Sequence, residues 1–292
     1  MLDAPLVPPP DAGRVFRAER TVRLGDADRS GRLRLDACAR YLQDLGNDDT
    51  ADSGIDQPGT TWVVRRAVVD VHRPPVWGEQ VALSTWCGGI GGRWAGRRLA
   101  MRGGRGGHVE IDTLWVHIDL TTGVPTRLPA RFLDCYGEAA QGRRISSRLW
   151  LGEPPADASV RRWPLRAVDL DLLGHVNNAA YWAAVEQVAR DERGERGRLL
   201  AAPHRTVMEY GPGIDPGDAV DLLVQDDEER LSLWLAVGGA VRAAAALMPM
   251  PAAAGHQRSV AASGAASMLA PGSSPPSTPG SSTPTSSGGA TT

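Results

Sequence analysis

The order of predicted elements limits the fold of this chain most strongly, because the same order occurs twice. In each half, a predicted strand is followed by a helix and then by four further strands. The first strand and helix are expected at 14–25 and 35–46, and their counterparts at 161–168 and 178–190. The remaining strands are expected at 62–73, 79–87, 93–102 and 109–119, and then at 205–210, 218–225, 230–237 and 240–247.

Short sequence matches support a duplication. The tetrapeptide DRSG (28–31) matches DLLG (171–174) at an offset of 143 residues (171 minus 28), and both precede a predicted helix. WGEQV (77–81) matches PGDAV (216–220) at an offset of 139 residues (216 minus 77), and both precede a predicted strand. Two similar offsets in matching contexts predict two related domains of roughly 110–140 residues.

The helix at 178–190 is apolar on nearly every side, which predicts that a sheet wraps around it. Glu186 is the exception, and we expect it to pair with an arginine, although a role in a site remains an alternative. The fold class is therefore α+β, with two antiparallel sheets that each enclose one long central helix. Merging the two sheets would cover their exposed edges.

Composition divides the chain into five segments. Residues 1–12 are proline-rich and expected to be flexible, 13–140 form the N-terminal domain, 141–160 a linker and 161–248 the C-terminal domain. Residues 249–292 are rich in Pro, Ser, Gly and Thr, so they bury too little apolar surface to offset the entropy of ordering. We expect that tail to be disordered.

Charge and cysteine content exclude several classes of protein. The net charge is −2, which argues against a general nucleic-acid binder. All 32 basic residues are arginines, which indicates a coding bias first and a function second. No apolar run is long enough to cross a bilayer, so no membrane span is expected. The three cysteines lie far apart and no secretory signal is evident, which favours reduced thiols and a cytoplasmic location. No spacing of His, Cys and Asp indicates a metal site, and no cofactor is expected.

The glycine-rich runs GGIGG (88–92) and GGRGG (103–107) separate predicted strands. A phosphate-binding loop is one interpretation, but neither run opens a helix. Hairpin turns, in which glycine supplies a positive φ, are the favoured interpretation.

The stretch VDLDLLGHVNNAAYW concentrates polar groups where the second long helix begins. Asn177 or Asn178 can cap the helix, and the first helix amides then point outward with the positive end of the helix dipole behind them. Such amides would stabilise the oxyanion of an ester or thioester carbonyl. Asp171 could attack that carbonyl or deprotonate a water, and His175 could position the substrate or assist proton transfer. A plain capping motif and turn is the alternative.

The same stretch resembles the D-x-x-G-H-V-N-N-x-x-Y motif of hot-dog-fold thioesterases. Three other segments resemble the acyl-ACP thioesterases, namely RPPVWGEQVALSTW in 73–98, LWVHIDLTTGVPTRLP in 114–129 and HRTVMEY in 204–210. The resemblance covers roughly 14–247. It implies a tandem double hot-dog fold and hydrolysis of the thioester between a fatty acyl chain and acyl carrier protein, with the chemistry in the C-terminal repeat.

The resemblance also assigns roles. Asp171 and His175 are expected to be catalytic, and substrate binding is expected from Gly174, Asn177, Asn178 and Trp182, the last lining an acyl tunnel. In the first repeat RLRL (32–35) replaces HVNN, which fits a non-catalytic copy that shapes the acyl pocket. The expected partner is acyl carrier protein, and the protein is expected to be a monomer or homodimer.

Two departures from the plant enzymes leave alternatives open. Leu173 stands where they carry an asparagine, and Gly213 and Ile214 lie near their acid and cysteine, so Glu209 or Asp215 could assist instead. A thioesterase for acyl-CoA or a polyketide-type carrier is one alternative. A non-catalytic acyl-binding protein is another, whereas a hot-dog hydratase is disfavoured because the motif lacks the Asn-Pro pair of those enzymes.

Overall fold

A computed structural model describes residues 5–55, 58–191, 200, 203–227 and 230–250. Its helices are α1 (Leu35–Ser53), α2 (Ala130–Tyr136) and α3 (Ala180–Asp191), with 3-10 turns η1 (Leu24–Asp26) and η2 (Ala167–Asp169). Its strands are β1 (Val15–Thr21), β2 (Thr60–Arg73), β3 (Gln80–Ile90), β4 (Trp94–Gly103), β5 (His108–Asp119), β6 (Ser159–Trp163), β7 (His204–Tyr210), β8 (Val220–Asp226), β9 (Leu231–Val237) and β10 (Ala240–Pro249).

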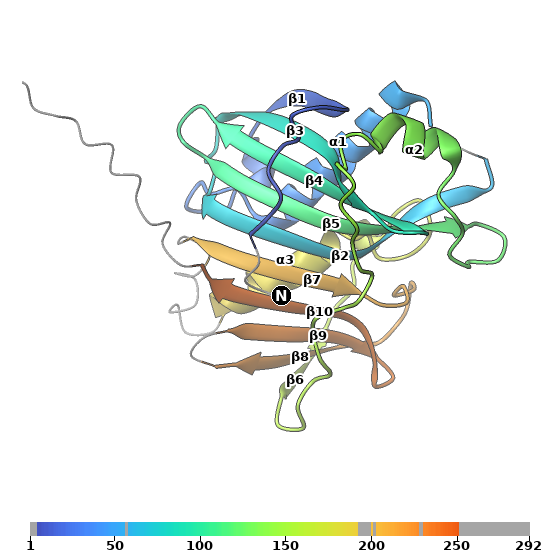
Figure 1. The fold of residues 1–292 in the computed structure, drawn as a ribbon. Helices are drawn as coiled ribbons and strands as arrows, with labels where there is room; N and C mark the ends of the chain where they lie inside the picture. The colour runs from blue at the N-terminus through green and yellow to red at the C-terminus, as the bar shows by residue number, and fades with distance from the viewer. Residues whose placement is uncertain (1–4, 56–57, 192–199, 201–202, 228–229, 251–292) are drawn as a thin grey trace, which may run out of the picture. The chain divides into compact units, whose positions relative to one another are not determined.

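All ten strands form one antiparallel sheet (Figure 1). Its order, β1-β3-β4-β5-β2-β7-β10-β9-β8-β6, reads the same from either edge once each strand is replaced by its counterpart in the other repeat. The repeats join where β2 pairs with β7, with Val68 opposite Val207. The predicted duplication is therefore seen as a pseudo-twofold arrangement that removes one open edge from each sheet.

Helices α1 and α3 lie together on one face of this sheet (Figure 1). Helix α1 turns Leu35, Cys38, Leu42 and Leu45 into the core, as its spacing predicts. It continues past its predicted end and stops at Gly54, whose left-handed backbone (φ 61°) is typical of a helix C-terminus. Helices α1 and α3 thus occupy the central positions expected for the two repeats.

The first strand of each repeat is shorter than the sequence predicts. Strand β1 ends at Thr21 and β6 at Trp163, and the chain then enters η1 and η2, respectively. These 3-10 turns lead into the two polar turns that precede α1 and α3. Helix α2 was not expected from the sequence.

The two glycine-rich runs have different roles. GGRGG forms the predicted hairpin turn, where the Gly103 amide donates to the Gly107 carbonyl. In GGIGG, Gly88 and Gly89 belong to strand β3, which ends at Ile90, and Gly91 and Gly92 form the predicted turn to β4, where the Gly91 amide donates to the Trp94 carbonyl (2.8 Å). A Cβ at Gly89 would lie 2.5 Å from the Cγ2 of Ile145, so glycine is needed for the linker to pack against β3.

The linker at 141–158 crosses the sheet face opposite the helices (Figure 1). The Glu209 carboxylate of β7 accepts hydrogen bonds from the amides of Trp150 (2.6 Å) and Leu151 (2.9 Å). The Arg66 guanidinium of β2 donates to the Arg148 carbonyl and stacks 3.6 Å from the Trp150 ring centroid. The linker is therefore attached to both repeats at their junction.

The two predicted terminal segments are only partly covered. Among residues 5–12, the Val7 carbonyl accepts a hydrogen bond from Arg98 at 3.0 Å. Strand β10 includes Pro249, but residues 251–292 lie outside the described part of the chain, so the disordered tail stays a prediction. None of the described helices combines the length and apolar character needed to cross a membrane.

Candidate active site in the C-terminal repeat

The two polar turns that precede α1 and α3 have the same hydrogen-bonding pattern. In the second repeat, the Asp171 amide donates to the His175 carbonyl (2.9 Å) and the Gly174 amide to the Asp171 carbonyl (3.0 Å). In the first repeat, the Asp28 amide donates to the Arg32 carbonyl (2.8 Å) and the Gly31 amide donates to the Asp28 carbonyl (2.9 Å). Gly174 and its counterpart adopt φ of 78° and 84°, which glycine tolerates best. The predicted offset of 143 thus describes equivalent backbone positions.

At the start of α3, Asn177 acts as the cap. Its Oδ1 accepts the Ala179 amide at 2.8 Å, and its Nδ2 lies 3.5 Å from Oδ2 of Asp171. The other Asp171 oxygen accepts the Leu173 amide at 2.9 Å. Within the described chain, the amide of Asn178 has no hydrogen-bond acceptor. A carboxylate and an unpaired helix-start amide therefore belong to the same short turn.

Buried side chains fix the position of Asn178. The Tyr210 hydroxyl donates to the Asn178 carbonyl (3.2 Å) and accepts from the indole Nε1 of Trp182 (2.8 Å). Burial raises the pKa of the Tyr210 phenol, so this donor stays protonated. Trp182 is only 1% exposed. It lies in the core behind the turn, and its predicted contact with an acyl chain stays a prediction.

His175 is paired with a carboxylate from the second half of the site. Its Nδ1 lies 2.6 Å from Oδ1 of Asp215, and both side chains are about half exposed. A Cβ at residue 213 would lie 3.2 Å from the His175 imidazole, so the absence of a side chain at Gly213 leaves room for the ring. Of the two suggested helpers, Asp215 is brought to the site, whereas Glu209 holds the linker on the opposite face of the sheet.

The equivalent position in the first repeat is closed by a buried ion-pair cluster. Glu186 of α3 accepts the Leu35 amide through Oε1 (2.7 Å) and the Arg32 guanidinium through Oε2 (2.6 Å). Asp28 pairs with Arg32 at 3.1 Å and with Arg190. The predicted pairing of Glu186 with an arginine is confirmed.

This cluster also fixes the charge of Asp28. Burial alone would raise the pKa of the Asp28 carboxyl, but the hydrogen bonds from Ser30 and Arg190 and the charge of Arg32 hold it well below its usual range. The carboxylate therefore stays ionised and paired. In the first repeat, both the acid and the helix-start amide are committed to contacts within the protein.

Geometry makes the second turn the candidate site. An aspartate next to an unpaired main-chain donor at a helix N-terminus can act as general base or nucleophile toward a carbonyl whose oxyanion the amide stabilises. The histidine–aspartate pair provides a proton carrier at the same turn. The departures at Leu173, Gly213 and Ile214 leave this set intact.

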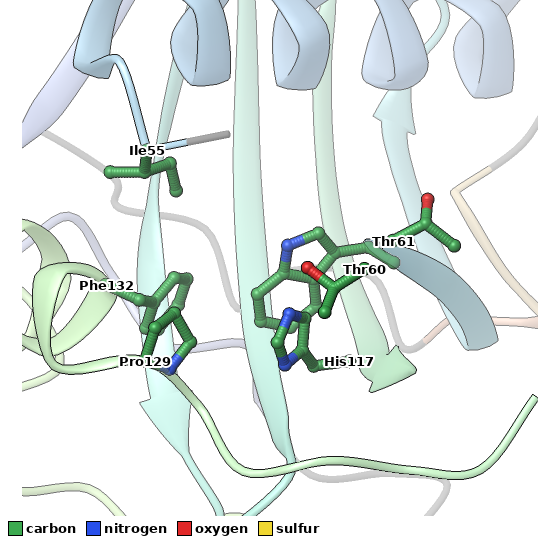
Figure 2. Close-up of a pocket in the computed structure, with 7 residues that line it drawn as sticks. Ile55, Thr60, Thr61, His117, Pro129 and Phe132 are labelled. Carbon is green, nitrogen blue, oxygen red and sulfur yellow. The ribbon is translucent and has the colours of Figure 1, made fainter. Parts of the chain in front are cut away.

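A small cavity lies elsewhere, at the far end of α1 (Figure 2). It has a volume of about 70 Å³ and is lined by Ile55, Thr60, Thr61, Trp62, His117, Pro129 and Phe132. Ligand pockets usually measure roughly 300 Å³ or more. The cavity is therefore too small to hold a fatty acyl chain.

One group of side chains has ligand types suited to a metal ion. Donor atoms of His72, His108 and Glu110 lie within 4.8 Å of one another on β2 and β5. The Arg102 guanidinium lies 3.3 Å from Oε1 of Glu110, and its charge works against a cation there. The group belongs to the first repeat and contributes nothing to the turn at Asp171.

Two family models match the chain. The acyl-ACP thioesterase N-terminal domain matches residues 13–136, and the acyl-ACP thioesterase C-terminal domain matches 152–237. The chain belongs to the acyl-ACP thioesterase family. As a member of this family it is a thioester hydrolase. The gap between the two matches, residues 137–151, overlaps the predicted linker at 141–160.

Relatives of this acyl-ACP thioesterase are found in bacteria and plants. An uncharacterized protein of Mycobacterium tuberculosis is 31% identical over 246 residues, which cover 84% of this chain and 96% of the relative. A chloroplastic dodecanoyl-acyl-carrier-protein hydrolase of Umbellularia californica is 28% identical over 200 residues, covering 61% of this chain and 52% of the relative.

Solved structures confirm the fold. The 12:0-ACP thioesterase from Umbellularia californica has a TM-score of 0.66 and 20% identity, covering 80% of this chain and 96% of that one. An acyl-ACP thioesterase from Bacteroides thetaiotaomicron has a TM-score of 0.64 and 18% identity, covering 80% and 97%. The predicted α+β class with two tandem hot-dog repeats is therefore confirmed.

Proposed function

We propose that this protein hydrolyses the thioester of acyl-ACP and releases a free fatty acid, with its chemistry at the turn before α3. One observation carries the assignment. The amide of Asn178 is unpaired within the described chain and lies in the same turn as Asp171, whereas its counterpart, Leu35, is occupied by Glu186.

The proposed reaction uses these groups in sequence. The thioester oxygen accepts the Asn178 amide, and the positive end of α3 stabilises the developing oxyanion. Asp171 removes a proton from a water that attacks the carbonyl carbon, or attacks directly to form an anhydride that water then opens. The C–S bond breaks and the sulfur takes a proton from His175, whose ring is oriented by Asp215. Gly174 and Asn177 hold the turn against the substrate.

The test compares carriers. Purified protein is incubated with acyl-ACP and acyl-CoA of the same chain length, and free fatty acid and thiol are measured. We expect faster release from acyl-ACP. Faster release from acyl-CoA would favour a CoA thioesterase, and tight binding of acyl-ACP without release would favour a non-catalytic acyl-binding protein.

A chain-length series then addresses the acyl pocket, which we propose is shaped by the first repeat and by Trp182. Each methylene accommodated or excluded is worth about 1–3 kcal/mol, so rates should change sharply at one length. A flat profile across lengths would contradict a pocket of fixed depth.

We further propose that the reaction serves fatty acid biosynthesis in the cytoplasm. The three cysteines, Cys38, Cys87 and Cys135, are free, which suits a reducing compartment. Fractionation of the native cells locates the protein, and light scattering distinguishes a monomer from a homodimer.

A further inference from the structure

The pseudo-twofold symmetry relates contacts at the first turn to contacts at the second. The offset of 143 takes Leu35 at the start of α1 to Asn178 before α3. It takes Gln43, in the middle of α1, to Glu186 in α3. The buried residues of the two helices follow the same offset, since Leu42 and Leu45 correspond to Val185 and Val188, which are all buried.

The contact between Glu186 and the Leu35 amide crosses from one helix to the other. Glu186 reaches from the middle of α3 to the start of α1, at 2.7 Å. The twofold relation makes residue 43, in the middle of α1, the counterpart of Glu186, and the amide of Asn178 the counterpart of the Leu35 amide. In the same way, Gln43 and His175 are the counterparts of the paired Glu186 and Arg32.

We infer that Gln43, a residue of the first repeat, completes the active site of the second. Its side-chain amide donates to the thioester oxygen together with the main-chain amide of Asn178, which gives the oxyanion two donors. The inference rests on the proposed function for its chemistry, but its placement rests on the symmetry alone.

The residue type at each position fits this division. The carboxylate of Glu186 accepts the helix-start amide itself, so it closes the first turn. A neutral carboxamide at position 43 carries two N–H donors and does not compete as an anion for the amide of Asn178. Gln43 is half-buried, and no hydrogen bond of its side chain is found among the described residues. It is thus available to a substrate.

Two variants test the role in catalysis. For Gln43→Ala we expect kcat on acyl-ACP to fall about 10²–10³-fold, the usual loss for one oxyanion donor, with KM and melting temperature near those of wild type. Gln80→Ala, which removes an exposed carboxamide from β3, is the matched control and should leave kcat unchanged. Wild-type kcat in Gln43→Ala would overturn the inference.

Gln43→Glu gives a readout that a merely structural role would not produce. Its carboxylate should accept a hydrogen bond from the Asn178 amide, as Glu186 does from the Leu35 amide. The ionised variant should therefore be less active, because this amide is no longer available to the substrate. The ratio of its rate to that of wild type should rise as pH falls toward the carboxyl pKa of about 4.3. A ratio independent of pH would contradict the placement.

A measurement without substrate separates the two proposals. In Gln43→Glu, the amide ¹⁵N–¹H signal of Asn178 should show a response to pH in addition to the one it shows in wild type, because a new carboxyl lies next to it. If wild type releases no fatty acid but this additional response occurs, the proposed function fails and the placement stands. If wild type is active but the signal shows no additional response, the placement is wrong.

Discussion

At the scale of single residues, two aspartates in equivalent turns differ because of their neighbours. Asp28 is enclosed by Arg32 and Arg190, whereas the partners of the Asp171 carboxylate within the described residues are the Leu173 amide and the carboxamide of Asn177. A paired, buried carboxylate contributes to folding, and a carboxylate with free lone pairs is available for chemistry. The sequence distinguishes the two positions through the residues that follow them, RLRL (32–35) and HVNN (175–178).

Neutralising each aspartate should therefore have opposite consequences. For Asp171→Asn we expect a loss of about 10²–10⁴-fold in kcat on acyl-ACP with little change in melting temperature. For Asp28→Asn we expect about 1–3 kcal/mol lower stability, because Arg32 and Arg190 lose one buried carboxylate and keep Glu186 as a partner, with kcat retained below the melting transition. Denaturant unfolding and steady-state rates measure both. Equal effects of the two variants on kcat would contradict the assignment.

The histidine group of β2 and β5 makes stability depend on pH. Burial, the charge of Arg102 and the neighbouring His72 lower the pKa of His108 from 6.5 to about 4. The folded state thus resists protonation that the unfolded chain accepts, so stability present above about pH 6.5 is lost as pH falls toward 4. In His108→Asn the free energy of unfolding should fall less steeply over this range. Parallel curves for the two proteins would show that His108 is not the group responsible.

At the scale of elements, the start of α3 combines a helix cap with the candidate site. Asn177 bonds the Ala179 amide through its oxygen and approaches Asp171 through its nitrogen. The sequence predicts a cap and a site as alternatives for this turn, and the geometry provides the cap together with an unpaired amide next to it. Capping and availability for chemistry therefore coexist because they use different amides.

Two substitutions at this cap separate the functions. Asn177→Ala should cost about 1 kcal/mol of stability through the lost cap and also lower kcat. Asn177→Asp keeps an accepting oxygen, so stability should be near wild type, but a second carboxylate beside Asp171 should lower the rate at neutral pH. Thermal melts and rates on acyl-ACP provide the comparison, and an active Asn177→Asp variant would show that the nitrogen contact is dispensable.

Much of the element order follows from the sequence, because alternation and helical spacing report which face is buried. The strand ends at Thr21 and Trp163 could not be predicted from the sequence. They depend on the 3-10 turns that follow, which are stabilised by hydrogen bonds from the Arg34 amide to the Asp26 carbonyl and from the Asn177 amide to the Asp169 carbonyl. The site follows in part. The motif identifies Asp171 and His175, but the pairing of His175 with Asp215 and the closure by Glu186 depend on tertiary contacts that no local pattern contains.

At the scale of the whole molecule, the junction of the repeats is an internal interface of the sheet. Asp70 of β2 accepts two hydrogen bonds from Arg205 of β7, each 2.6 Å long, and both residues are buried. The linker crosses the same junction through Glu209 and Arg66. The repeats therefore share stabilising contacts, and we expect them to unfold together.

Calorimetry tests this coupling. Residues 5–250 should unfold in a single transition. Asp70→Ala should lower the temperature of this transition without splitting it, because Arg205 loses two hydrogen bonds to a buried carboxylate. Ser84→Ala in β3, away from the junction, provides a reference. Two separate heat-absorption peaks would show that each repeat folds independently.

The carboxylate of Glu186 has a further consequence for how such a chain can vary. In a dimer of two identical subunits, an acid at this helix position would accept the helix-start amide of the other subunit at both sites. Neither amide would then be available to a substrate. In a single polypeptide that contains both repeats this constraint is removed, because positions 43 and 186 are then encoded by separate codons. The turn of the first repeat can then be closed by an ion-pair cluster while the turn of the second repeat keeps an unpaired amide for substrate. Two identical subunits encoded by one gene could not differ in this way.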